Sequence, residues 1–295
     1  MSINNGNGQD QKPAVVISCS YPPPVDGEDT TYIIHREVVT LFHEFGHCMQ
    51  MILSNVEYSS LRDFINLPWD VIELPSTLFE NFAKQSTVLK KISKHKETGE
   101  PLTEDQVKKL NAMVDCMPAC DEMNILIFAW FDLRLHYEYD VSKKSQVRDL
   151  KAETENLIFT YPSYYRRENH FRHPFMKDYD SLDNCGYASR YYSYIWSRII
   201  TKEVWVRFKK EGVLKKEVAM DFKKIILESM FTKEPLELVN EFLKRPQDQM
   251  VTMDAYLKKF RKNVDKPLLE FTLFKQDENS EIAKDKVCQV NINKP

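Results

Sequence analysis

Apolar residues recur at helical spacing along most of this chain. The first strong pattern covers residues 38–52, where two apolar stripes make most sides of a helix hydrophobic. A helix of that kind is expected to be buried. Further helices are predicted at about 70–82, 103–116, 119–138, 143–159, 218–230 and 236–243. Residues 14–19 form a short β-type run that ends before three prolines, and they are predicted to be a strand.

Composition supports one mainly helical domain. With 295 residues, of which 42% are hydrophobic, the chain can bury a sizeable core, and only seven glycines interrupt it. We expect a mainly α, multi-helical domain over residues 13–270, with a short N-terminal β element. Residues 1–12 are expected to be a disordered tail, and residues 271–295 a loose C-terminal tail.

The net charge and the cysteines indicate which partners and which cellular compartment to expect. The formal net charge of −3 gives no electrostatic reason to expect binding to nucleic acid or membrane, and no apolar run approaches membrane length. The six cysteines show no framework of spacings and are expected to be reduced thiols. The N-terminal residues resemble neither a secretory signal nor a typical presequence. We therefore expect a cytoplasmic protein, with the mitochondrial matrix as the alternative.

Within the first predicted helix lies a His-Glu-x-x-His motif. Residues four apart share a helix face, so His43 and His47 would point two imidazoles at one zinc ion. Glu44 follows the first histidine and could act as general base on a water at the metal. The motif occurs by chance in roughly one chain in a hundred of this composition, so a third ligand is needed to support the interpretation.

Two routes to a third ligand can be tested in the sequence. One known pattern places a histidine six residues after the second histidine and a glycine three residues after it. Leu53 and Gln50 occupy those positions, so this pattern is excluded. The other route takes a carboxylate from a following helix. The candidates in order are Glu57, Asp63, Asp70, Glu73 and Glu80.

The two motifs together resemble a known family. His-Glu-Phe-Gly-His, followed by Ile-Glu-Leu-Pro-Ser-Thr-Leu-Phe-Glu-Asn-Phe, is similar to the zinc oligopeptidases related to thimet oligopeptidase, neurolysin and mitochondrial intermediate peptidase. The segment 186–198, rich in tyrosine, resembles the same family. The resemblance implies a zincin-like catalytic domain with one Zn²⁺, held by His43, His47 and Glu73, and with Glu44 as base. It further implies that Tyr187 and Tyr194 stabilise the oxyanion or position the peptide.

The resemblance also implies a substrate and an architecture. Family members cut short peptides internally, so a zinc metalloendopeptidase acting on short peptides is expected. They are longer chains with a helical N-terminal wall, so a missing N-terminal part or a partner chain is expected to complete the cleft. The strand at 14–19 would then have its partner strands upstream of Met1.

The chain departs from the family pattern before the first tyrosine. A histidine usually stands four or five residues earlier, where this chain has Leu182 and Asp183. An inactive or truncated zinc-bound helical module that binds peptides or a partner chain therefore stays open as the alternative function.

Overall fold

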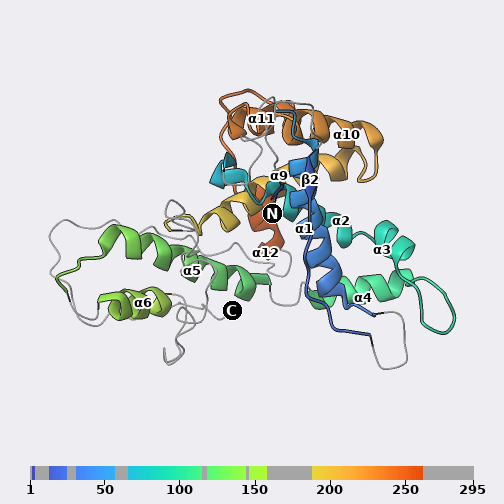
Figure 1. Ribbon diagram of the computed structural model, residues 1–295, viewed down its shortest axis with the longest axis horizontal. Coiled ribbons are helices and arrows are strands. Elements are labelled where there is room, and N and C mark those ends of the chain that lie inside the picture. Colours follow the sequence, from blue (N-terminus) through green and yellow to red (C-terminus); the bar gives the residue numbers. More distant parts are fainter. Residues whose placement is uncertain are drawn as a thin grey trace, which may run out of the picture. The chain divides into compact units, whose positions relative to one another are not determined.

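The computed structural model describes residues 2–3, 13–24, 31–56, 66–114, 118–143, 146–157 and 188–261. Helices dominate these residues, which confirms the mainly α fold (Figure 1). In chain order the helices and helical turns are α1 (His35–Leu53), η3 (Trp69–Val71), α2 (Leu74–Ala83), α3 (Ser86–Ile92), α4 (Glu104–Val114), α5 (Pro118–Glu138), α6 (Gln146–Asn156), α9 (Ser193–Glu211), α10 (Lys216–Asp221), η4 (Phe222–Leu227), α11 (Pro235–Leu243) and α12 (Asp254–Arg261).

One hydrophobic core joins residues 67–78 to residues 200–242. Buried side chains come from η3, α2, α9, α10, η4 and α11. Leu74 and Leu78 of α2 meet Val204 and Phe208 of α9 there, and all four are almost fully buried. Burial of this apolar area is the main term that holds α2 in place. Because α2 follows directly on Glu73, the core also fixes the position of that carboxylate.

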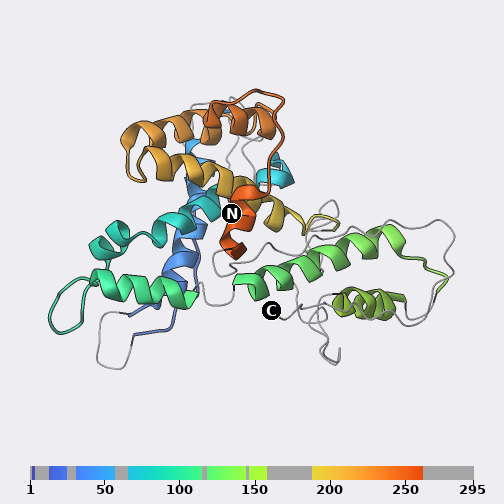
Figure 2. The same cartoon turned by 180° about the vertical axis from the view of Figure 1, so that it is seen from behind.

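The metal-motif helix α1 packs on α2, and the helix pair α5 and α6 lies side by side in both views (Figures 1 and 2). At its far end α1 is tied to η4, a short π-helix. The Gln50 side-chain amide donates to the Leu227 carbonyl oxygen at 3.0 Å, and Asn55 N–H donates to the Glu228 carbonyl oxygen at 3.0 Å. Leu227 is the last residue of η4, and the carbonyl oxygens of a helix's last turn have no partner within the helix, so this one can anchor α1.

Two sequence expectations differ from the structure. The strand is only Ala14–Val15 (β2), and it pairs in antiparallel fashion with β1 (Ser2–Ile3). Part of the expected N-terminal tail is therefore paired. The first helix is also less buried than expected, because Phe45 and Ile52 are 44% and 43% exposed. Phe45 nevertheless contacts Phe79 of α2, with ring centroids 5.9 Å apart.

Candidate metal centre

The two motif histidines lie on one face of α1. Their spacing of four residues brings the ring centroids of His43 and His47 to 4.9 Å from each other, edge to face. The helix begins at His35, where the Glu37 carboxylate accepts the Ile34 N–H at 2.8 Å and satisfies one of the free amides of the first turn.

Gly46, between the histidines, allows α1 to approach α2 closely. A Cβ at this position would lie 2.6 Å from Ser76 Cα and 2.7 Å from the Pro75 carbonyl oxygen. Both contacts are with backbone, so a larger residue would push the helices apart. The glycine thus brings the His43 and His47 face against the start of α2, where Glu73 lies.

Glu73 supplies the third ligand atom of the group, a carboxylate oxygen. It precedes α2 directly and is 3% exposed, so its carboxylate needs polar partners. Its Oε2 lies 3.3 Å from His43 Nε2 and 3.2 Å from His47 Nε2, and it accepts the Ser76 hydroxyl at 2.7 Å. The three ligand atoms all lie within 4.8 Å of one another and could hold a metal ion.

The spacing of these atoms fits one tetrahedral ion. Two ligand atoms at about 2.1 Å from a metal, at a tetrahedral angle, are separated by about 3.4 Å. The distances of 3.3 and 3.2 Å from Glu73 Oε2 to the two imidazole nitrogens match that separation. The donor set of two imidazoles and one carboxylate leaves a fourth position open.

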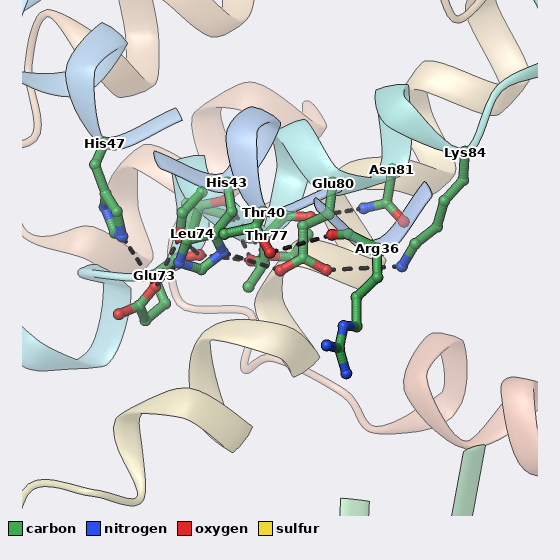
Figure 3. A network of polar contacts seen from close by, with 12 residues as sticks. Arg36, Thr40, His43, His47, Glu73, Leu74, Thr77, Glu80, Asn81 and Lys84 are labelled. Atoms are coloured by element: carbon green, nitrogen blue, oxygen red, sulfur yellow. Dashed lines mark hydrogen bonds and ion pairs between the residues drawn. The ribbon is translucent and has the colours of Figure 1, made fainter. Parts of the chain in front are cut away.

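The second nitrogen of His43 is held by another carboxylate, that of Glu80. His43 Nδ1 lies 2.9 Å from Glu80 Oε1, and the other oxygen of Glu80 lies 3.6 Å from Lys84 Nζ (Figure 3). A carboxylate only accepts, so Nδ1 carries the hydrogen and Nε2 faces the metal position. This is the arrangement by which metal-ligating histidines are commonly oriented.

The electrostatics of the group favour a cation between its members. Burial by itself lowers the pKa of His43, but hydrogen bonds to Glu73 and Glu80 raise it to about 10. Burial opposes the charge on Glu73 and Glu80 as well, yet their bonds to the histidines hold the pKa of each carboxyl below its usual range. In the metal-free group, the proton on His43 balances the charge of the ionised carboxylates, and a bound metal would replace that proton.

The remaining predicted site residues have different outcomes. Glu44 lies on α1 beside His43 and is half-buried. Tyr194 lies in the first turn of α9, with its ring centroid 5.0 Å from that of Tyr191. Tyr187 lies outside the described residues. Helix α9 begins only at Ser193, so Tyr191 lies in the turn that precedes it.

The other carboxylates that the sequence offered as third ligand do not belong to the ligand group of the described residues. Asp70 is not part of the ligand group, because its Oδ1 accepts the Tyr192 hydroxyl at 2.8 Å. Glu80 supports His43. Glu57 and Asp63 fall in the part of the chain left undescribed. Glu80 was one of the candidate ligands in the sequence. Its supporting role depends on how closely α2 approaches α1, and sequence spacing gives no information about that.

Behind Glu80 lies a polar cavity of about 150 Å³ between α2, α5 and α9. It is lined by acidic and basic side chains in balance, Glu80, Asp121 and Glu122 against Lys84, Arg198 and Lys202. Arg198 Nη1 lies 3.1 Å from Glu122 Oε2, which also accepts the Tyr256 hydroxyl at 2.8 Å. The positive charges of Lys84 and Arg198 help to lower the pKa of the Glu80 carboxyl.

A helical domain that sets a His-Glu-x-x-His helix against a glutamate at the start of the next helix defines the class of zincin-like helical peptidase domains. Comparison with known proteins agrees with this assignment. The model of peptidase family M3 matches residues 1–259, and the chain belongs to that family.

Its relatives are peptidases of bacteria and eukaryotes. Oligopeptidase A of Escherichia coli is 33% identical over 256 residues, which cover 86% of this chain and 36% of the relative. Dipeptidyl carboxypeptidase of Salmonella typhimurium is 29% identical over 73% of this chain and 31% of its own length. Mitochondrial intermediate peptidase of Malassezia globosa is 28% identical over 80% of this chain and 28% of its own length. The chain thus spans about a third of the length of the relatives it matches.

Among the described residues, no helix has the length and apolar character needed to cross a membrane.

Proposed function

We propose that this chain is a zinc-dependent metalloendopeptidase of the oligopeptidase type. His43 Nε2, His47 Nε2 and Glu73 Oε2 would hold one Zn²⁺, and Glu80 would keep His43 in the tautomer that binds it. The observation that carries the proposal is the convergence of these three atoms at 3.2 and 3.3 Å, with His43 Nδ1 turned to Glu80 at 2.9 Å.

Each remaining residue has a separate task in the proposed reaction. Zinc, when bound, polarises the scissile carbonyl and makes a water more acidic. Glu44 accepts the proton of that water and passes it to the leaving amine. The Tyr194 hydroxyl, with that of Tyr187, donates hydrogen bonds to the oxyanion of the tetrahedral intermediate or holds the peptide. Zinc would be bound by neutral imidazoles, so loading should release the proton held by His43.

The substrate class and setting follow from the family. We propose short peptides as substrates, cut at internal bonds, because several relatives are named oligopeptidases. A cytoplasmic location is proposed, with the mitochondrial matrix as the alternative. A further N-terminal part or a partner chain would complete the cleft around the peptide.

A second function is kept because of the departure at Leu182 and Asp183, where the family has a histidine. In this alternative the chain holds zinc and binds peptides or a partner chain without cutting them. The retained Glu44 favours the enzyme, since zinc binding alone does not use that carboxylate.

Cleavage of a quenched fluorescent nonapeptide tests the proposal. The purified chain should cleave it, should lose activity with a zinc chelator, and should regain it when zinc is added back. Glu44→Gln should keep stoichiometric zinc and lose at least about 10³-fold in kcat. Glu217→Gln, at an exposed position on α10, is the matched control and should keep full activity. Full zinc loading with no cleavage by the unaltered chain would instead favour the binding module.

A further inference from the structure

A buried carboxylate on α5 holds the turn from which α9 starts. Asp132 is 0% exposed, and its two oxygens accept two backbone amides of the turn. Oδ1 accepts the Ser189 N–H at 3.1 Å, and Oδ2 accepts the Tyr191 N–H at 3.1 Å. His136, one helical turn further along α5, hydrogen-bonds through Nδ1 to the Asp132 carbonyl oxygen at 2.8 Å, and the same nitrogen lies 3.1 Å from Oδ1. A carboxylate in this position needs such donors, since burial without them is costly.

The turn is in a conformation that its sequence does not favour. Ser189 has φ of +60°, in the left-handed region that residues other than glycine and asparagine rarely adopt. Its N–H and that of Tyr191 point at the same carboxylate, so the bonds to Asp132 oppose relaxation to an ordinary backbone conformation. The shape of the turn is therefore set from α5 and not by the turn residues alone.

The same contact fixes the aromatic side chains at the start of α9. Tyr191 is 6% exposed, and its ring centroid lies 6.1 Å from that of Phe128 on α5 and 5.0 Å from that of Tyr194. Tyr191 thus sits between α5 and the tyrosine to which we assign the oxyanion. Moving the backbone at Tyr191 would move the surface against which the Tyr194 ring rests.

From its other side the turn is tied to the segment that presents Glu73. The Tyr192 hydroxyl donates to Asp70 Oδ1 at 2.8 Å, and the Ser197 hydroxyl donates to the Asp70 carbonyl oxygen at 2.9 Å. The Arg190 guanidinium lies over the Trp69 ring at 4.9 Å. Through these contacts the turn spans from α5 to the residues just before the third metal ligand.

We propose that Asp132 is a positioning residue of the peptidase: it locks the 188–192 turn and so sets Tyr194 relative to Glu73. The inference rests on the proposed function, because Tyr194 must act on the reacting peptide for its position to matter. Asp132 itself touches neither metal nor substrate in this role.

Asp132→Asn tests the proposal with little change of shape. An amide can accept one of the two N–H groups but presents its own NH₂ to the other, so the turn loses one anchor. We expect kcat to fall about tenfold or more and KM to change less than about threefold, since misplacing a catalytic group lowers the rate of the bound complex. Zinc content should be unchanged, and amide hydrogen exchange at residues 189 and 191 should accelerate.

A double-mutant cycle with Tyr194→Phe separates positioning from general destabilisation. If Asp132 acts through Tyr194, its substitution costs little kcat once the hydroxyl is absent, so the two effects are strongly non-additive. Adding Ser189→Gly to Asp132→Asn should restore part of kcat, because glycine adopts positive φ without the carboxylate. Additive effects in the cycle, or an unchanged kcat in Asp132→Asn, would overturn the proposal.

Glu203→Gln is the matched control. Glu203 is also buried, on the same helix as Tyr194, and accepts the Thr252 N–H at 2.8 Å. Glu203→Gln should lower the free energy of unfolding about as much as Asp132→Asn does. It should leave kcat unchanged and combine additively with Tyr194→Phe.

Glu44→Gln in the same assay distinguishes failure of this inference from failure of the proposed function. Loss of cleavage in Glu44→Gln with normal kcat in Asp132→Asn rejects only the role of Asp132. If the unaltered chain does not cleave, the cycle is run on the affinity for a phosphinic peptide, whose tetrahedral oxygen would accept the Tyr194 hydroxyl. A chain that neither cleaves nor binds that peptide rejects the peptidase and, with it, the positioning role.

Discussion

At the scale of single residues, the His43 imidazole is held at both nitrogens by carboxylates of one neighbouring segment. Glu73 faces Nε2 at 3.3 Å and Glu80 faces Nδ1 at 2.9 Å. The two carboxylates are seven residues apart, two turns of helix, so both reach the same side of α1. Glu73 would bind the metal directly, whereas Glu80 would act by orienting the ring and making it a better donor.

Glu80→Ala should therefore weaken zinc binding without removing a ligand. We expect the dissociation constant for zinc, measured by competition with a chromophoric chelator, to rise about 10- to 100-fold. Glu80→Gln should cost less, because its amide oxygen can still accept from Nδ1. Asp121→Asn, which alters an acidic residue of the same cavity without touching His43, is the control. Unchanged affinity in Glu80→Ala would contradict the supporting role.

The metal-free chain should show a pH dependence set by the same residues. The pKa of His43 is raised from 6.5 to about 10, so its contribution to stability is complete below about pH 6.5 and is lost as pH rises through 10. The pKa values of Glu73 and Glu80 are lowered, so their contributions exist above pH 4.5 and are lost on acidification. The free energy of unfolding should peak between these limits.

Chemical denaturation of the chelator-treated chain at several pH values measures this dependence. Zinc-loaded protein is the comparison, and its stability should fall less between pH 6.5 and 10, since the metal takes the place of the proton. A metal-free stability that rises over that interval would contradict the assignment of the charges.

At the scale of elements, the site depends on how closely two helices meet. The start of α2 reaches α1 where Gly46 has no side chain, and the Thr77 hydroxyl of α2 contacts the Thr201 hydroxyl of α9 at 2.6 Å. Helix α2 is thus held between α1 and α9 by small and hydrogen-bonding residues on both sides. This packing, and not any single ligand, brings the two motifs together.

Gly46→Ala should disturb both the fold and the site. Its methyl group would meet backbone atoms at 2.6 and 2.7 Å, and backbone cannot turn aside as a flexible side chain can. We expect a loss of about 1–3 kcal/mol in the free energy of unfolding and weaker zinc binding. The denaturant midpoint and a zinc titration measure the two effects. Thr40→Ala, at an exposed position of the same helix, is the control and should change neither quantity. If Gly46→Ala were as stable as the unaltered chain, α1 and α2 could separate without cost.

These contacts explain which parts of the fold and of the site could be predicted from the sequence. Helices with strong periodicity were predictable, as α4 and α11 show, because their apolar faces are local patterns. His43 and His47 were predictable for the same reason, since helical spacing alone places them together. The sequence could not reveal the supporting role of Glu80 or the hold of Asp132 on residue 189. Both depend on which helices meet, and sequence separation carries no signal of that.

At the scale of the whole molecule, the core and the site belong to one compact unit, Met1–Phe260. The buried cluster runs from Leu67 to Phe242, and the match to peptidase family M3 ends at residue 259. Stability and metal binding should therefore be properties of residues up to the end of α12.

Ending the chain after Asn263 should leave that unit intact. The core cluster of the described residues, the metal group and the Tyr256 contact with Glu122 are retained in the shorter chain. We expect the free energy of unfolding to change by less than about 0.5 kcal/mol, as for changes remote from packed residues, and zinc to bind with the same affinity. Ending the chain after Gln249, which removes α12 and the Tyr256 hydroxyl that Glu122 accepts, is the matched comparison and should be destabilising. Loss of stability in the longer of the two truncated chains would mean that residues beyond 263 hold part of the fold.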